Sequence, residues 1–257
     1  MKKSLILIAL LMVLCFCTSS YAANAAGQQW YVGIGGSYAL ENFDGGDVED
    51  FLDYVGVDVD FDDGWGANLS VGYHVNDNCS LAFVYSYLSG FDSDESATFE
   101  EVMAAVGVTE DDLMDFGVSS EDLAVLHMAD ISLGAQIDVD VMTFMLEGKY
   151  AMSGNVSPYL VLGLGLMYAD ADGDLRVGAA GQSFSFGGED DSDTEICWKV
   201  GLGVDWWVTP NVTVGLEGSY VAAFSDLEFD LLDIPDVGAA EMGIEYFNIG
   251  LGVAYHF

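Results

Sequence analysis

The nine residues from Ile249 to Phe257 read I-G-L-G-V-A-Y-H-F and alternate strictly between large apolar side chains and small or polar ones. Successive side chains of a β-strand point to opposite faces, so this segment predicts a strand with one continuous apolar stripe. The opposite stripe contains Gly250, Gly252, Ala254 and His256. Such a strand is typical of a transmembrane β-barrel, in which the apolar stripe meets lipid and the other stripe lines a narrow interior.

The same alternation recurs along the chain. In one segment Trp65, Leu69 and Val71 are predicted to face lipid, whereas Gly66 and Ser70 face inward. Each segment has about the length that a tilted strand needs to cross a bilayer. There are eight such segments, and barrels of this kind require an even number of strands. We therefore predict an all-β, transmembrane, antiparallel up-and-down β-barrel with strands at 30–40, 65–75, 79–91, 138–152, 158–172, 194–208, 211–224 and 244–257.

The charge distribution fixes the orientation of this barrel. Hydrophobic residues make up 52% of the chain, yet its formal net charge is -38, so apolar and acidic residues must be segregated. The acidic residues gather in four stretches, and the other connections are tight turns at Asn76–Asn78, Ser153–Ser157 and Thr209–Asn211. Short turns face the periplasm and long loops face outward. The acidic stretches at 41–63, 92–140, 170–195 and 226–245 are therefore predicted to lie outside.

The N-terminal segment predicts export. Basic residues at Lys2 and Lys3 precede an apolar run from Ser4 to Cys17, and small residues follow it, which is the pattern of a secretory signal peptide. We expect a signal peptide at residues 1–22, with cleavage possible as late as residue 25, and a single barrel domain over 23–257. No later stretch approaches the roughly 20 apolar residues of a membrane helix. A membrane location then requires a closed barrel, and we expect the outer membrane.

One segment leaves two alternatives open. Residues 127–137 carry apolar side chains at odd positions, whereas Met142, Phe144 and Leu146 are even. Either a β-bulge near Val141 changes the parity, or the segment extends a strand above the membrane. A ten-stranded barrel that also recruits residues 175–187 is the alternative to eight strands.

Several motifs carry a family resemblance: Trp30 to Gly36 at the start of the barrel, Gly72-Tyr73, Pro158-Tyr159-Leu160, Gly201 to Asp205 and the terminal Phe257. With them the chain resembles the small OmpA-like and OmpX-like barrels, the outer membrane protein β-barrel domain proteins that include surface antigens and porin-like members. The resemblance implies a non-enzymatic role in envelope integrity, adhesion or ligand contact, and in some members a narrow pore. Tyr255 and Phe257 also resemble the C-terminal signal that the barrel-assembly machinery reads.

The interior of an eight-stranded barrel is just wide enough for its own side chains. Two basic residues, Lys149 and Lys199, have inward parity. Acidic residues with the same parity are Glu147, Glu195, Asp205 and Glu217. Because an unpaired buried charge is costly, we predict that a cluster of Glu147, Lys149, Lys199 and Glu217 pairs and closes the lumen. The alternatives are a gated polar path, as in a narrow porin, or an OmpW-like channel for small molecules, against which the inward Gly, Ser, Asn and Glu residues argue.

The loops carry three similar stretches, Glu49–Val57, Glu100–Val108 and Glu110–Val118, each predicted as a short helix. Thr109 and Asp112 form a capping-box-like pair, and a glycine follows each helix as a C-terminal stop. We expect these helices to pack their apolar side chains together and order the loops, with a surface for an extracellular partner as the alternative.

The acidity of the loops has two interpretations, general solvation of the carboxylates and specific binding of cations. Solvated acidity is favoured, but two aspartate runs resemble oxygen-ligand calcium loops, and bound divalent cations would bridge loops to one another or to lipopolysaccharide. Neither run completes an EF-hand. The weak calcium ligands predicted are Asp58, Asp60, Asp62, Asp170, Asp172 and Asp174. The lack of clustered Lys and Arg argues against nucleic acid as a partner, and we expect no cofactor.

Few residues suggest catalysis. The chain has only three histidines, His74, His127 and His256, and no Ser-His-Asp set can be assembled from their order. We predict no enzyme, with a lipid-modifying enzyme as the remote alternative. Cys79 and Cys197 are expected near opposite ends of the barrel, too far apart for a disulfide.

Overall fold

The computed structural model describes residues 29–43, 61–115, 117–119, 121, 129, 131–179, 182–229 and 240–257. The predicted signal peptide, the helix expected at 49–57, His127 and the aspartates at 58 and 60 lie outside these residues.

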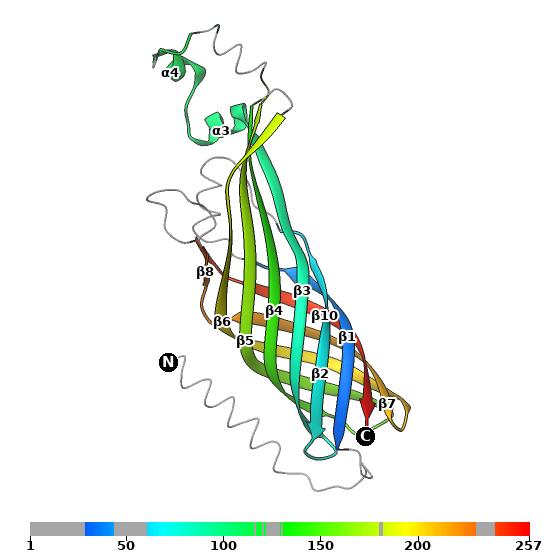
Figure 1. Ribbon diagram of the computed structural model, residues 1–257. Helices are drawn as coiled ribbons and strands as arrows, with labels where there is room; N and C mark the ends of the chain where they lie inside the picture. The colour runs from blue at the N-terminus through cyan, green and yellow to red at the C-terminus, as the bar shows by residue number, and fades with distance from the viewer. Residues whose placement is uncertain are drawn as a thin grey trace.

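Eight antiparallel strands form a closed barrel (Figure 1). Each pairs with the neighbouring barrel strand along the chain, and the first and last close the ring. The strands are β1 (Trp30–Glu41), β2 (Gly64–His74), β3 (Cys79–Thr98), β4 (Ser132–Ala151), β5 (Val156–Ala179), β6 (Gln182–Thr209), β7 (Val212–Ala223) and β10 (Glu245–His256). The eight-stranded prediction is confirmed. The ten-stranded alternative is wrong, because residues 175–179 and 182–187 lengthen β5 and β6 and add no strand to the ring.

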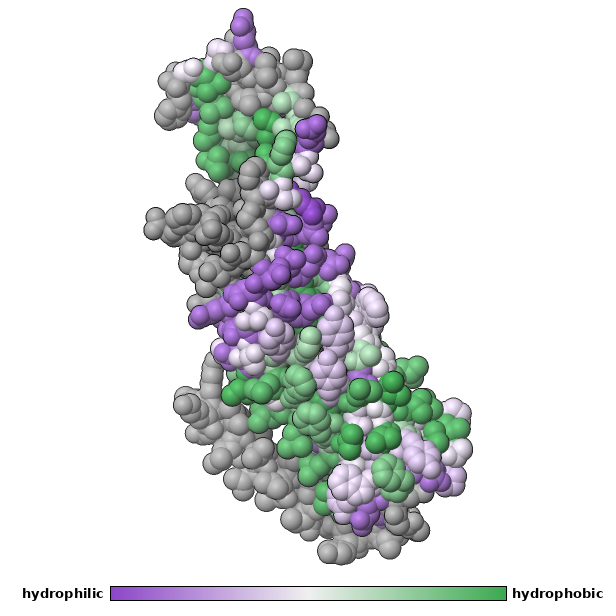
Figure 2. Space-filling view, in the orientation of Figure 1, coloured by the Kyte–Doolittle hydropathy of each residue, from purple (hydrophilic) through white to green (hydrophobic). Residues whose placement is uncertain are grey.

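Large apolar side chains cover the outside of the barrel, as the alternation predicts. Leu69, Leu202 and Leu251 expose 53%, 66% and 60% of their surface, which suits a face that meets lipid. Figure 2 shows this apolar band over the lower part of the barrel, with a hydrophilic belt above it. No helix among the described residues has the length and apolarity to cross a bilayer.

Four strands continue far above the apolar band. β3, β4, β5 and β6 have 20, 20, 24 and 28 residues, whereas β1, β7 and β10 have 12 each. In Figure 1 they rise beyond the other strands towards the helices at the tip. We call the parts of these four strands above the apolar band the strand extension. It consists of residues 91–98 of β3, 132–140 of β4, 169–179 of β5 and 182–193 of β6. The strands predicted at 79–91 and 158–172 end too early and those predicted at 138–152 and 194–208 begin too late, because the acidic outer faces of the extension resemble loops in sequence.

The parity question at residues 127–137 has a clear outcome. From Ser132 onward the segment extends β4, and its odd residues from Ala135 to Glu147, including Ile137, Val141 and Met145, are buried inside the barrel. The predicted change of parity near Val141 is wrong. A bulge does occur, but in β3, where the pairing register shifts between Leu88 and Phe91 and Gly90 has a φ of 93°. Along β4 the inward side chains change instead, from polar in the lower barrel to apolar in the upper barrel.

The upper interior is filled by an apolar stopper, defined as the buried side chains of the wall and of two external loops. Phe61 comes from the loop before β2, and four residues come from the loop between β7 and β10, where β8 (Leu227–Phe229) pairs with β9 (Ala240–Met242). Its members are Phe61, Leu88, Phe91, Ile137, Val139, Val141, Met145, Met167, Ala169, Cys197, Val221, Leu227, Phe229, Met242, Ile244 and Tyr246, none more than 8% exposed. The expectation of a polar lumen therefore holds only below the stopper.

Two short helices lie at the tip of the strand extension (Figure 1). α3 (Phe99–Ala105) begins with a capping box between Thr98 and Glu101. α4 (Glu110–Asp115) begins with the predicted pair, in which the Thr109 N–H donates to Asp112 Oδ2 at 2.8 Å and the Asp112 N–H donates to Thr109 Oγ1 at 3.3 Å. These bonds to the carboxylates lower the pKa of Glu101 and of Asp112. Gly107 and Gly117 follow with φ of 69° and 97°, as expected for helix stops.

Candidate functional site

A cavity of about 680 Å³ occupies the lower barrel beneath the apolar stopper. We call it the periplasmic pocket, because turn residues line its lower end, including Asn78, Ser153 and Pro210. Its upper end reaches Ser86, Glu217 and Asn248. The pocket is therefore polar and ends beneath an apolar barrier.

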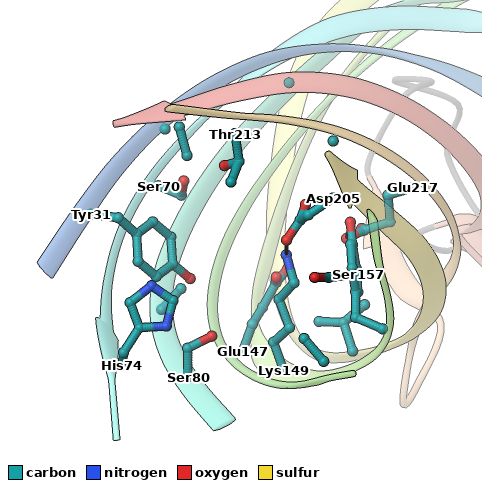
Figure 3. A pocket seen from close by; sticks show the side chains of 18 of the residues that line it. Tyr31, Ser70, His74, Ser80, Glu147, Lys149, Ser157, Asp205, Thr213 and Glu217 are labelled. Carbon is teal, nitrogen blue, oxygen red and sulfur yellow. Dashed lines mark hydrogen bonds and ion pairs between the residues drawn. The ribbon is translucent and has the colours of Figure 1, made fainter. Parts of the chain in front are cut away.

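Two ion-pair groups occupy the pocket, and Figure 3 shows Lys149 beside Asp205, with Glu147 and Glu217 from the other group nearby. Lys199 Nζ lies 2.7 Å from both Glu147 Oε1 and Glu217 Oε1, and the side chains of Lys199 and Glu147 are each only 10% exposed. Lys149 Nζ lies 2.6 Å from Asp205 Oδ2. These contacts place all four residues of the predicted cluster in one pocket, where every lysine has a carboxylate partner.

Tyr159 connects the two groups. Its hydroxyl donates to Glu217 Oε2 at 3.0 Å, and Lys149 Nζ lies 3.5 Å from its ring centroid. The cluster predicted from sequence does not contain Tyr159, and Asp205 is predicted only as an inward residue. The inward parity of both was the available signal, since odd residues of β5 and β6 face the lumen.

Glycines between the charged residues make these contacts possible. Gly163 pairs with Glu147 on one side and with Lys199 on the other, so the two charged side chains meet across an intervening strand. A Cβ at Gly163 would lie 3.2 Å from Lys199 Cβ and 3.4 Å from Glu147 Cγ. Glycine therefore provides the space for the ion pair.

Glu195, which shares the inward parity, does not join the cluster. It lies higher on β6, and its carboxylate accepts a hydrogen bond of 2.8 Å from Ser225 Oγ. The stopper residue Cys197 stands between it and Lys199 along the inward face of β6. No disulfide joins Cys197 to Cys79.

Two histidines meet at the lower end of the pocket. His74 ends β2 and His256 ends β10, and their rings stack with centroids 5.2 Å apart. His74 Nε2 lies 3.0 Å from His256 Nδ1, and His256 Nε2 lies 3.0 Å from Thr213 Oγ1. Their inward parity was predicted from sequence, but their contact was not, because β1 lies between β2 and β10.

The candidate calcium ligands have a different setting from the one expected. Asp170, Asp172 and Asp174 all lie within β5, whereas the strand predicted at 158–172 ends before Asp174 and the calcium ligands were expected in a loop. Asp62 precedes β2, and its N–H donates to the Asp92 carbonyl at 2.9 Å. Among the residues that the structure describes, no group of three or more His, Cys, Asp or Glu side chains is arranged to hold a metal. The calcium site stays a prediction.

The strand extension instead carries an unusual aspartate row. Asp92 pairs with Asp138, Asp138 with Asp172, and Asp172 with Asp190, each directly opposite the next on adjacent strands. Like charges directly opposite one another are destabilising. Partial burial and the neighbouring carboxylates raise the pKa of Asp92 and of Asp172.

A closed antiparallel barrel with an apolar outer band and a polar lower interior defines a transmembrane outer-membrane protein. The family model described as outer membrane protein beta-barrel domain matches residues 8–257, and the chain belongs to this family. Its location is the outer membrane.

Solved structures of small outer-membrane barrels resemble the chain. Neisserial surface protein A matches with a TM-score of 0.46 and 17% identity over 92% of this chain and 100% of its own. Ail, the attachment invasion locus protein of Yersinia pestis, matches with a TM-score of 0.41 and 15% identity over 90% of this chain and 99% of its own. OprG from Pseudomonas aeruginosa matches with a TM-score of 0.46 and 14% identity over 90% of this chain and 96% of its own. No curated protein matches the chain.

Proposed function

We propose that this protein is a non-enzymatic, non-conducting barrel that anchors the strand extension at the cell surface for envelope integrity or adhesion. The observation that carries the proposal is the apolar stopper. Tyr246, Phe91 and Phe229 are at most 2% exposed within it, and water-filled passage past such side chains is unfavourable.

The charged pocket adds a second barrier. Both lysines of the lumen are paired with carboxylates at 2.6–2.7 Å, so a passing ion would have to displace strong, partly buried ion pairs. These two barriers argue against the narrow-porin alternative and against an OmpW-like channel.

The strand extension supplies the surface for interaction. Residues Gln182–Ile196 of β6 continue beyond its last β7 partner, which is Cys197 paired with Ala223. At roughly 3.3 Å per residue this segment spans about 50 Å along the strand. A chain that needed only to fill the membrane would not require such a structure, so we assign the external role to it.

Planar-bilayer conductance of the refolded chain tests closure, with and without millimolar calcium. We expect no stable current steps from the natural chain. A variant with Phe229→Ser and Met242→Ser, which loosens the stopper, should show more frequent openings. Stable ion-selective steps from the natural chain would move the protein to the porin class.

A variant that shortens the strand extension without changing the pairing register of the remaining strands tests the surface role. Phe91 pairs with Val139, and Ala171 pairs with Asp191, so two-residue Asn-Gly turns can replace residues 92–138 and 172–190 without changing the strand pairing below. We expect cells with the trimmed barrel to insert it normally but to lose the attachment or detergent resistance that the full chain confers. Equal phenotypes for both chains would overturn the surface role.

A further inference from the structure

The histidine pair lies where a metal ion from the periplasm would first meet the pocket. Both rings line the periplasmic pocket beside its turn residues (Figure 3 shows His74 next to Tyr31). His74 is half-buried and His256 is 4% exposed. The Tyr31 ring lies 5.1 Å and 5.3 Å from the two imidazole centroids and supports both.

The two facing nitrogens have the separation of neighbouring ligands on one metal. His74 Nε2 and His256 Nδ1 are 3.0 Å apart. Metal–nitrogen bonds of about 2.0–2.1 Å would join them at roughly a right angle. A right angle matches adjacent positions of a square-planar or tetragonal ion such as Cu²⁺, whereas tetrahedral Zn²⁺ prefers a wider separation.

Thr213 holds His256 in a suitable orientation. When His256 donates its Nε2 proton to Thr213 Oγ1, 3.0 Å away, the Nδ1 lone pair faces His74. Ligating histidines usually donate the second ring N–H to such an outer partner. His74 needs only to move its proton from Nε2 to Nδ1, so two neutral rings can bind the ion without releasing a proton.

The pocket as a whole holds more carboxylates than ammonium groups. Its ion-pair groups contain the carboxylates of Glu147, Asp205 and Glu217 but only the two ammonium groups of Lys149 and Lys199. Asp77 at the lower end adds a further negative charge. Apart from the effect of the two rings on each other, Lys149 is the charge that acts most strongly on both histidines, with Asp205 and Asp77 opposing it at His74. Binding therefore depends on the two imidazole nitrogens and their geometry and not on the charge of the pocket.

We propose that His74 and His256 form a binding site for a divalent transition-metal ion, preferentially Cu²⁺, on the periplasmic side of the barrel. Water in the pocket completes the coordination. The site is independent of the strand extension and of whatever the extension contacts.

Copper titration of the untagged, refolded chain tests the site. Isothermal titration should show one Cu²⁺ per barrel, and pulsed EPR should show two coordinated imidazoles. The key variant is His127→Gln, which leaves His74 and His256 as the only histidines of the chain. It should keep both the affinity and the two-imidazole signal.

Two further variants locate the ion. His74→Gln should weaken Cu²⁺ binding at least tenfold and leave one imidazole, and Thr213→Val should weaken it several-fold. If His74→Gln fails to fold, the imidazole count of His127→Gln alone decides. Fewer than two imidazoles in His127→Gln, unchanged affinity in His74→Gln, or tighter binding of Zn²⁺ than of Cu²⁺ would overturn the proposal.

Discussion

Lys199 is the residue on which the lumen charges depend most. Its ammonium group contacts two carboxylates at 2.7 Å, whereas Lys149 contacts one and is 22% exposed. Breaking a buried pair costs about 3–5 kcal/mol, because the partner charge is left uncompensated. We expect Lys199→Met to lower the free energy of unfolding by about 3 kcal/mol and Lys149→Met to lower it by clearly less.

Urea unfolding in lipid vesicles, followed by tryptophan fluorescence, measures both variants. A triple variant with Lys199→Met, Glu147→Gln and Glu217→Gln should recover much of the loss, since it removes the uncompensated charges with their partner. Equal losses for Lys199→Met and Lys149→Met would contradict the larger dependence of the lumen charges on Lys199.

Gly66 shows why small residues line the interior. A Cβ there would lie 1.9 Å from the Tyr87 carbonyl oxygen and 2.9 Å from Leu88 Cα, so the backbone of β3 would have to move. We expect Gly66→Ala to destabilise the barrel by about 1–3 kcal/mol in the same unfolding measurement. Gly36→Ala is the matched control, because its nearest neighbour would be 3.7 Å away. A loss in Gly36→Ala as large as that in Gly66→Ala would contradict the steric explanation.

At the scale of elements, the aspartate row makes the strand extension sensitive to pH. The pKa values of Asp92 and Asp172 are raised in the folded chain, so the folded state binds these protons more readily than the unfolded state. Lowering the pH from neutral through the raised values therefore stabilises the extension, and the gain ends below the ordinary value of about 4. We expect hydrogen-exchange protection of the β4 and β5 amides, corrected for intrinsic rates, to rise as the pH falls from 7 to about 4.

Asparagine variants separate this effect from general acidity. Asp138→Asn with Asp172→Asn should raise the protection at pH 7 and flatten its pH dependence, whereas Asp226→Asn, outside the row, should do neither. If calcium binds as the sequence analysis predicts, it should protect the natural extension more than the double variant. Unchanged protection in the double variant would show that the row carries little repulsion.

The strands themselves show what local pattern can and cannot predict. The predicted ends of β1, β2, β7 and β10 all agree with the structure within one residue, because apolar alternation and turn residues mark them directly. β3 to β6 were cut short, since their upper outer faces carry aspartates that resemble a loop in sequence. Pairing on adjacent strands, which is not local in sequence, keeps these segments extended.

At the scale of the whole molecule, the stopper was the feature that sequence could not supply. Inward residues such as Val139 and Val141 are apolar, and an apolar side chain in a barrel strand is normally assigned to lipid. Their burial depends on Phe61, Leu227 and Phe229, which two loops distant in sequence bring into the mouth. The lysine cluster, by contrast, could be predicted from sequence, because the inward parity of its residues and the cost of an unpaired buried charge were sufficient.

The last strand closes the barrel, and its terminal aromatics test whether closure and assembly are separate properties. Phe257 exchanges backbone hydrogen bonds with Trp30 at 2.9 Å and 3.2 Å, but it is 55% exposed and its ring stacks on that of Tyr255 with the centroids 6.3 Å apart. Phe257→Ala keeps the backbone bonds and removes only an exposed ring. We therefore expect nearly unchanged urea unfolding after refolding in detergent, but several-fold slower insertion into vesicles that contain the barrel-assembly machinery. Phe247→Ala, which removes another exposed ring from the same strand, should insert at the natural rate. Equal insertion of Phe257→Ala and Phe247→Ala would mean that the terminal ring acts only as a lipid anchor and that the machinery recognises the strand by its backbone.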